Sequence, residues 1–361
     1  MWHRTLLVLM LNSAIFGHRQ AILDSLPVMQ RGQILFLGEQ HYIEEILDLE
    51  VAIIKHAAQT SKDTITVFLE LPCVENYYVN QLFQFNDSLP LYNYLNIMPD
   101  KVLTKYISKA FFSLYDVYLQ NRNLKLICID GNPSIDRFLY TLDMLFSKYA
   151  QLPFCIREMR DEIALCLQGS DSQLVKSDAS VAKFRKHFKK FKKEYKSSLT
   201  EEDFNFIVLN IDNFHTNMDD REALLYRNIC RHYSSNQRFI VIIGATHANK
   251  KEIQFTRKKY SSKTKPVACL LNNKRSSPFN SQVFSLYITP LTLWVPQFPD
   301  SDNDDVVWHG YPFFSPRMPD KIKKELIGRN HHITIKIFDK TSNQEPFDGY
   351  VLIRDAHTMI Y

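Results

Sequence analysis

The stretch Gln33-Ile34-Leu35-Phe36-Leu37-Gly38-Glu39-Gln40-His41 decides the fold class. Its core, Ile34 to Leu37, is apolar throughout and too short for a helix, which is typical of a strand buried in a parallel sheet. From Tyr42 to Thr60, apolar residues then recur at roughly helical spacing. Gly38 to His41 therefore lies where a strand passes into a helix, at the edge of open α/β sheets where ligands bind.

An acid and a histidine stand at this predicted strand end. If the chain stays extended through His41, the side chains of Glu39 and His41 point to the same side, because side chains alternate along a strand. A carboxylate beside an imidazole can bind a metal or transfer a proton. The alternative is an acid at a helix N-terminus followed by an ordinary surface histidine.

The same pattern recurs along the chain. Strands are expected at 65–70, 125–129 and 239–243, and they end near Glu70, Asp130 and Gly244. The last is followed by His247, three residues after its glycine, as His41 is after Gly38. Strand and helix patterns in alternation predict an α/β fold, with a mainly parallel central sheet flanked by helices.

Further elements are expected from local pattern. Helices are predicted at 74–85, 101–120, 133–149, 219–233 and 248–259, and strands at 267–271, 282–288, 333–338 and 350–353. Residues 151–200 show helical pattern without a strand, so they are predicted to be a helical insertion in a single domain spanning 18–361. The acidic run 300–305 lacks the glycine and closing glutamate of a calcium loop and is expected to be solvated.

Charge is concentrated in one segment. The whole chain has a net charge of +5, whereas Lys183 to Lys196 alone holds eight Lys or Arg and one Glu. Phe184, Phe188, Phe191 and Tyr195 form one helical stripe within it. The segment is either a packed helix with a solvated basic face, or a lid, or a surface for anionic membranes or an acidic partner. No nucleic-acid motif accompanies it, so nucleic acid is not an expected partner.

The N-terminus has the shape of a secretory signal. A short basic start is followed by an apolar run, so residues 1–17 are predicted to be a signal peptide and the protein to be exported, periplasmic or secreted. The alternative is a cytoplasmic protein with a first buried helix, which the six cysteines favour. They form no CxxC pair and are expected to be buried free thiols.

Short motifs in order resemble a known superfamily: the erythromycin esterases, the ChaN-like haem-iron-binding proteins and the TIKI-type metalloproteases. The matching segments are Gly38 to His41, Glu70 in Leu-Glu-Leu, Arg221 to Ile229, Gly244 to His247, and Phe347 to Tyr350. Erythromycin esterases place two residues between Glu and His, whereas this chain has one, as in the ChaN-like branch. No GxSxG, phosphate-loop, GxGxxG or HExxH motif is present.

The resemblance implies a polar cleft at the strand ends. It assigns a base or ligand role to His41 and His247, acidic partners to Glu39 and Glu70, and a site-lining role to Arg221. The implied function is hydrolysis of an ester or amide bond in a small-molecule or peptide substrate. Water would be activated by His and Glu, or by a divalent metal, Zn or Mn, held by Glu39, His41, Glu70 and His247. The alternative is a haem or iron carrier without turnover, with Tyr42 as an iron ligand.

Overall fold

The computed structural model of the protein describes residues 23–131, 134–168, 178–214, 220–257, 260–297, 307–312, 318–328, 333–338 and 345–359. Its contacts divide the chain into two compact units. The first consists of Met1–Leu69, Leu95–Leu126 and Ile229–Tyr361, and the second of Glu70–Tyr94 and Ile127–Asn228. Each unit is described by itself below.

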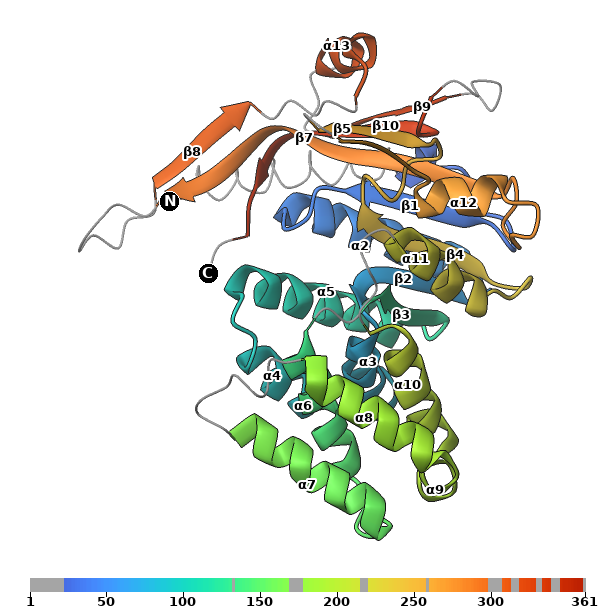
Figure 1. The fold of residues 1–361 in the computed structure, drawn as a ribbon. Coiled ribbons are helices and arrows are strands. Elements are labelled where there is room, and N and C mark those ends of the chain that lie inside the picture. The colour runs from blue at the N-terminus through green and yellow to red at the C-terminus, as the bar shows by residue number, and fades with distance from the viewer. Residues whose placement is uncertain are drawn as a thin grey trace. The chain divides into compact units, whose positions relative to one another are not determined.

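Most of the main sheet belongs to the first unit. Over the described residues it has eight strands, in the order β3-β2-β4-β1-β7-β10-β9, with β8 paired to β7 (Figure 1). Their bounds are β1 Ile34–Glu39, β2 Ile65–Pro72, β3 Leu124–Asp130, β4 Arg238–Gly244, β7 Val283–Gln297, β8 Val307–Pro312, β9 Ile333–Ile337 and β10 Gly349–His357. β2 and β3 run on into the second unit past Leu69 and Leu126. The predicted α/β class and the common sheet for 34–37, 65–70, 125–129 and 239–243 are confirmed.

β1 lies in the middle of the sheet. It pairs in parallel with β4 on one side and β7 on the other, and all six of its residues are buried. β2–β4 and β7–β10 pairs are also parallel, whereas β9 and β8 are antiparallel additions. A strand covered on both faces gains stability from every side chain, which explains why Ile34 to Leu37 does not alternate with polar residues.

Gly38 is required where β1 approaches the turn after β4. A Cβ at Gly38 would lie 2.8 Å from the Cβ of Ala248, 3.1 Å from the Leu286 oxygen and 3.3 Å from the Cα of Ala245. Two of these three atoms belong to backbone that cannot rotate away. The glycine therefore lets the end of β1 and the turn that carries His247 pack closely.

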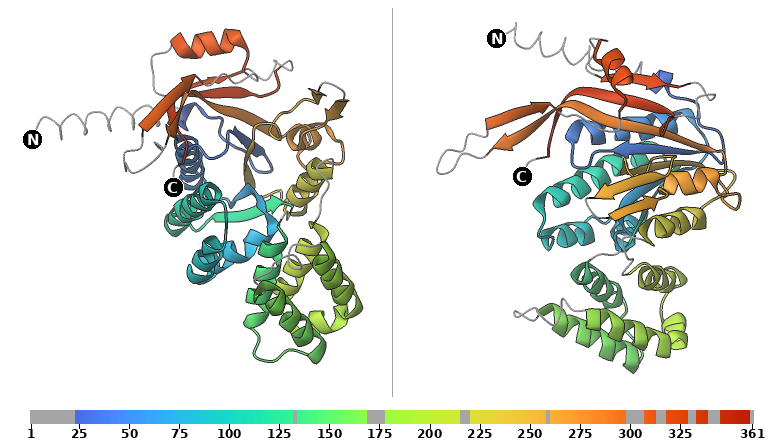
Figure 2. Two further views of the ribbon diagram at one scale, coloured as in Figure 1. Left: turned by 60° about the vertical axis from the view of Figure 1, so that its left-hand side comes forward. Right: turned by 45° about the horizontal axis from the view of Figure 1, so that its top comes forward.

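Helices of the first unit pack against strands of the sheet. They are α2 Glu44–Thr60, α5 Lys101–Gln120, α12 Val267–Asn273 and α13 Asp320–Gly328. α2 packs against α5 and β10, α12 against β7, and α13 against β9. Figure 2 shows β7 continuing beyond β1 into a ribbon with β8. β5 Ile253–Arg257 and β6 Tyr260–Thr264 form a separate antiparallel pair.

Two sequence predictions are wrong in this unit. The segment 267–271, expected as a strand, is helix α12, which begins directly after Pro266. The segment 248–259, expected as a helix, contains a turn and strand β5. Short apolar runs fit helix and strand alike, so the pairing partners decide between them.

The second unit is mainly helical. It contains the short 3-10 helix η1 Cys73–Glu75, α3 Asn76–Phe85, most of α4 Leu89–Asn96, α6 Ile135–Ser147, α7 Phe154–Gln168, α8 Asp178–Lys190, α9 Lys192–Ser198, α10 Glu201–Asp212 and most of α11 Arg221–Arg231. Side-chain caps fix where two of these helices begin. The Ser134 hydroxyl accepts a hydrogen bond from the Arg137 amide at the start of α6, and the Thr200 hydroxyl accepts one from the Asp203 amide at the start of α10. The described parts of 151–200 hold helices and no strand, as predicted.

The basic segment forms two helices rather than one, with the break at Phe191. Phe184, Phe188 and Tyr195 are buried, so the predicted apolar stripe packs into the unit. The lysines around it are exposed.

Some sequence predictions fall outside the described residues, namely the signal peptide at 1–17 and the acidic run 300–305. In the part of the chain that the structure describes, no helix is long and apolar enough to cross a membrane. All six cysteines are free thiols, as predicted, but only Cys73, Cys128 and Cys269 are buried, whereas Cys155, Cys166 and Cys230 are partly exposed.

Candidate functional site

Glu39 and His41 form a hydrogen-bonded pair at the end of β1. Nδ1 of His41 lies 2.8 Å from Oε1 of Glu39, so the two side chains share one side of the chain as predicted. The side chain of Glu39 is 2% exposed and that of His41 is 39% exposed. The hydroxyl of Tyr106, on α5, donates to the same Glu39 oxygen over 3.0 Å. A buried carboxylate thus holds a solvent-accessible imidazole in a fixed orientation.

The next residue, Tyr42, has a backbone that tyrosine seldom adopts. Its φ of 65° lies in the left-handed region, where a side chain larger than that of glycine or asparagine is strained. The surroundings hold it there. Its ring meets the Tyr106 ring edge-on at 5.5 Å, its carbonyl accepts from the Met359 amide at 3.0 Å, and Ile43 forms a bridge with Thr358. This strain turns the chain sharply from β1 into α2.

Glu50, which the sequence analysis did not single out, lies fully buried on α2. It occupies the helix face that carries Ile46, Leu47, Ile53 and Ile54. Burial first, and then the charge of Glu39 and a hydrogen bond with it, raise the pKa of Glu50 well above its usual range. The signal was present in the sequence, since an acid stands inside an apolar helical stripe, where charged residues are rarely found.

His247 follows β4, the parallel neighbour of β1. The register pairs Glu39 with Gly244, and the Ala245 amide donates to the Glu39 carbonyl at 3.0 Å. Both histidines therefore follow strands that end at the same edge of the sheet. His247 is half-buried, and its backbone is held by Gly244 and Ala268. The two histidines therefore do not lie at opposite edges of the sheet.

In the second unit, Arg221 binds two carboxylates. Its Nη2 donates to Oε1 of Glu70 in a short contact, and to Oδ2 of Asp130 at 2.6 Å, while its Nε donates to Oδ1 of Asp130 at 3.1 Å. Burial favours the neutral guanidine, but the hydrogen bond and charge of Asp130 and the charge of Glu70 outweigh it and raise the pKa of Arg221. The fork of Arg221 thus ties the ends of β2 and β3 to the start of α11.

The rest of the Arg221 motif is structural. Leu224, Leu225 and Asn228 are buried on one face of α11. Nδ2 of Asn228 donates to the Ile129 carbonyl at 2.8 Å, just before Asp130. This buried amide fixes α11 against β3 and so positions Arg221.

The predicted site residues therefore form two groups. Glu39, His41 and Tyr42 lie together in the first unit, at the end of the strand that pairs with β4, and His247 follows β4. Glu70 and Arg221 lie together in the second unit with Asp130. That all of them share one cleft stays a prediction.

A metal site needs several protein ligands around one position. Among the described residues, no three His, Cys, Asp or Glu side chains lie so that they could hold a metal ion. Glu39 is bonded to His41, and Glu70 to Arg221. The predicted ligand set does not fit a metal as it stands, so the mechanism below is derived from the side chains alone.

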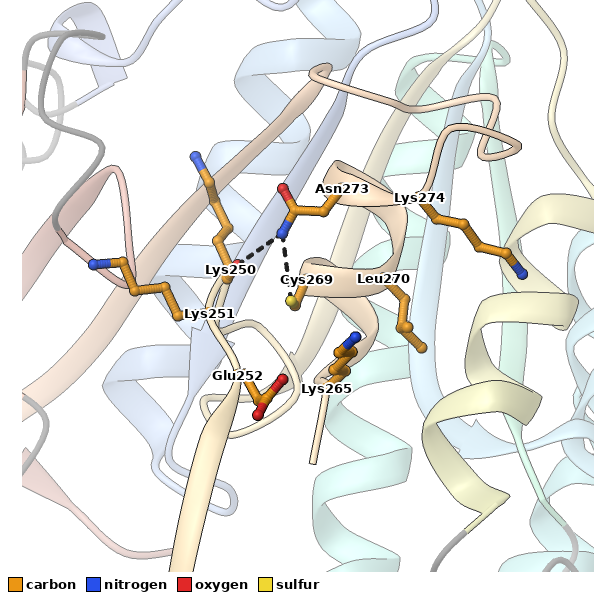
Figure 3. Close-up of a pocket in the computed structure, with 8 residues that line it drawn as sticks. All are labelled: Lys250, Lys251, Glu252, Lys265, Cys269, Leu270, Asn273 and Lys274. Atoms are coloured by element: carbon orange, nitrogen blue, oxygen red, sulfur yellow. Dashed lines mark hydrogen bonds between the residues drawn. The ribbon is translucent and has the colours of Figure 1, made fainter. Parts of the chain in front are cut away.

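The first unit also has a pocket that none of the predicted site residues lines. It measures about 550 Å³ and is lined by Lys250, Lys251, Glu252, Lys265, Cys269, Leu270, Asn273 and Lys274 (Figure 3). Lys250 also pairs with Asp348 at 2.6 Å. The side chains of Lys251 and Lys274 point away from one another in the figure, so they do not converge on one ligand position.

Comparison with known proteins gives matches in structure. No protein-family model matches the sequence, and no curated protein is similar enough to match. A mutant of the erythromycin esterase EreC in its open conformation is 14% identical, with a TM-score of 0.54, and the match covers 91% of this chain and 92% of that one. A Bacillus cereus protein is 11% identical, with a TM-score of 0.57 over 91% of this chain and 90% of that one.

A third match is weaker. ChaN of Campylobacter jejuni, solved with cofacial haem, is 14% identical and covers 81% of this chain and 91% of that one, but its TM-score is 0.33. The chain is therefore an α/β protein with the fold of erythromycin esterase EreC. At these identities the likeness concerns the fold, and the activity has to be argued from the site.

Proposed function

We propose that this protein is a hydrolase in which His41 activates water for attack on an ester or amide bond. One observation carries the proposal: an accessible imidazole bonded through Nδ1 to a buried carboxylate. The Glu39 carboxylate can only accept hydrogen bonds, so Nδ1 of His41 carries the hydrogen in this pair. The neutral ring then presents Nε2 with a lone pair, as a general base requires.

Each neighbour has a role in this proposal. Glu39 fixes the tautomer and stabilises the imidazolium that forms when His41 takes a proton from water. The Tyr106 hydroxyl restrains Glu39 on the same oxygen. His247, after the adjacent strand, is the residue proposed to stabilise the oxyanion that develops as water attacks. Within the second unit, Glu70 and Asp130 keep Arg221 in place at the strand ends.

The test is a substrate panel with matched histidine variants. Purified protein is assayed on p-nitrophenyl acetate, p-nitrophenyl butyrate and a peptide p-nitroanilide, with and without added Zn²⁺ or Mn²⁺. The His41→Asn variant is expected to lose roughly 10²- to 10⁴-fold in kcat/KM. His56→Asn, a histidine on α2 outside the site, is the control and should keep wild-type activity. A fully active His41→Asn protein would contradict the proposal.

The haem alternative makes a different prediction. A carrier that used Tyr42 as an iron ligand would give a Soret band on haem addition and lose it in Tyr42→Phe, without hydrolysing any member of the panel. A hydrolase would turn over substrate whether or not haem is present. Spectra and turnover measured on the same preparation separate the two functions.

A further inference from the structure

Positive charge is concentrated a second time along the chain, between Lys250 and Arg275. This segment holds nine Lys or Arg and one Glu, whereas the whole chain has a net charge of +5. In the first unit it forms the turn after β4, the β5–β6 pair and helix α12. Four of its lysines and its one acid line the pocket of about 550 Å³ in Figure 3. A hollow lined mainly by one sign of charge concentrates its field and attracts ions of the opposite sign.

Hydrogen bonds within the first unit hold the walls of this pocket in place. Nδ2 of Asn273, on α12, donates to the Lys250 carbonyl and to Sγ of Cys269, each at 3.4 Å (Figure 3). The ammonium of Lys250 pairs with Asp348 at 2.6 Å, and its amide donates to the Pro346 carbonyl at 2.9 Å. The turn after β4 is thus joined to α12 and to the turn before β10, so the pocket is preformed.

The charged residues of the lining are used in different ways. Lys250 is already paired with Asp348, and Glu252 pairs at 3.6 Å with Lys263, which lies outside the lining. Lys265 is exposed and forms no ion pair with any part of the chain that the structure describes. The acid of the lining therefore has a cation of its own, and the pocket keeps an excess of positive charge.

The directions of the lysines indicate what kind of anion fits. In Figure 3, Lys251 and Lys274 point to opposite sides, and Lys265 lies between them. A single phosphate or carboxylate cannot reach all three, whereas linked anionic groups can contact them in turn. Ammonium groups act as point charges and suit phosphate, because the planar fork that matches a carboxylate belongs to arginine. The volume is that of a small-molecule site.

We propose that this pocket binds a small molecule with two or more linked phosphate groups, such as a nucleoside triphosphate or inorganic tripolyphosphate. Lys251, Lys265 and Lys274 contact successive phosphates, and the half-buried Leu270 offers apolar surface to the remainder of a nucleotide. None of the residues proposed for hydrolysis lines the pocket, so binding is measured without any hydrolysed substrate.

The test is calorimetric titration of the whole chain with inorganic phosphate, tripolyphosphate and ATP. Wild type should bind tripolyphosphate and ATP roughly 10-fold more tightly than inorganic phosphate, and added salt should weaken the binding. The variant Lys251→Gln/Lys265→Gln/Lys274→Gln should lose roughly 10- to 100-fold in affinity. The control replaces three exposed lysines elsewhere in the first unit by Gln and should bind like the wild type; these are Lys62, Lys101 and Lys321.

Three results would overturn the proposal. Equal losses in the two triple variants would mean that net charge alone attracts the anion. Equal affinities for tripolyphosphate and inorganic phosphate would mean that linked phosphates are not recognised. If polyglutamate or a single-stranded oligonucleotide bound through these lysines while neither ATP nor tripolyphosphate did, the surface would belong to a macromolecular partner.

Lysine acetylation read by mass spectrometry locates the site on the unaltered chain, so it decides even if the pocket variant does not fold. Tripolyphosphate should slow acetylation of Lys265 and Lys274 several-fold and leave Lys62 and Lys321 unchanged. Protection by ATP as well would assign recognition to the phosphate chain, and protection by ATP alone would assign it to a nucleotide. Uniform protection of all four lysines, or none, would contradict a site in this pocket.

Discussion

At the scale of single residues, Tyr42 shows how the first unit maintains strain beside His41. A left-handed backbone costs a residue with a Cβ about 1–2 kcal/mol, whereas asparagine tolerates it better. Replacement of Tyr42 by either Asn or Ala removes the contact with the Tyr106 ring, so the difference between the two variants isolates the backbone. The Asn variant should be more stable than the Ala variant by about 1 kcal/mol in urea unfolding. Equal stabilities would mean that the positive φ is not kept in solution.

Glu75 gives the second unit a pH-dependent stability. It is fully buried in η1, and burial outweighs Arg137 and the Tyr94 hydrogen bond, raising its pKa to about 7. An acid with a raised folded-state pKa binds its proton more tightly when folded. Its contribution to stability is therefore complete below about pH 4.5, and is lost as pH rises toward 7.

The loss corresponds to about 3 kcal/mol, at about 1.4 kcal/mol for each unit of pKa. Glu75→Gln should remove this pH dependence. The free energy of unfolding of the variant, relative to that of the wild type, should therefore increase by about 3 kcal/mol between pH 4.5 and pH 8. Urea unfolding at both pH values measures the change, with Glu201→Gln as the exposed control. If the stability of Glu75→Gln still falls as pH rises, another group causes the pH dependence.

At the scale of helices and strands, the sequence predicts those elements whose residue pattern fits only one kind of structure. β1 and β4 could be located because a strand covered on both faces must be apolar throughout and end where the backbone turns. α12 is not distinguishable from a strand by local pattern, because Val267 to Leu271 is equally apolar and equally short. Glu50 could not be placed from sequence because sequence patterns put acids on the solvent side of a helix, whereas this acid lies fully buried on α2.

We propose that lysines of the basic helices α8 and α9 bind anionic membranes. Lys189, Lys190, Lys192 and Lys193 are exposed and lie off the buried stripe, so their replacement by Gln should leave folding intact. Each lysine near an anionic surface contributes about 1 kcal/mol, screened by salt. The variant should therefore bind phosphatidylserine vesicles more weakly at low salt in a sedimentation assay. A control with Lys62, Lys101, Lys321 and Lys324 replaced should bind like the wild type, and equal binding by both variants would leave these lysines a solvating role alone.

At the scale of the whole molecule, the rule that parallel strands end at one edge of a sheet predicts where the candidate residues lie, but not which side chains they contact. That His41 and His247 share an edge follows from two parallel strands. That Arg221 binds Asp130 as well as Glu70 could not be read from spacing, because three distant segments meet there. Sheet topology tells which ends lie at one edge, and side-chain contacts are decided by the packing of helices between them.

Export is a further proposal about the whole molecule. If residues 1–17 are a signal peptide, native protein should begin near His18 and be found outside the cytoplasm. Intact mass measurement of protein purified from its source decides this, since the loss of 17 residues is easily resolved. Native protein that still carried Trp2 to Gly17 would contradict export.

The central place of β1 also bears on how the chain is made. Its two neighbours, β4 and β7, are synthesised roughly 200 and 250 residues after it. At about 5–20 residues per second, β1 waits on the order of 10–40 s or longer on the ribosome before β4 emerges. During that time the apolar residues Ile34 to Leu37 of β1 have neither of these strands to pair with, and non-local pairing of this kind forms slowly. Newly made protein should therefore depend on chaperones that cover β1 until β4 and β7 arrive.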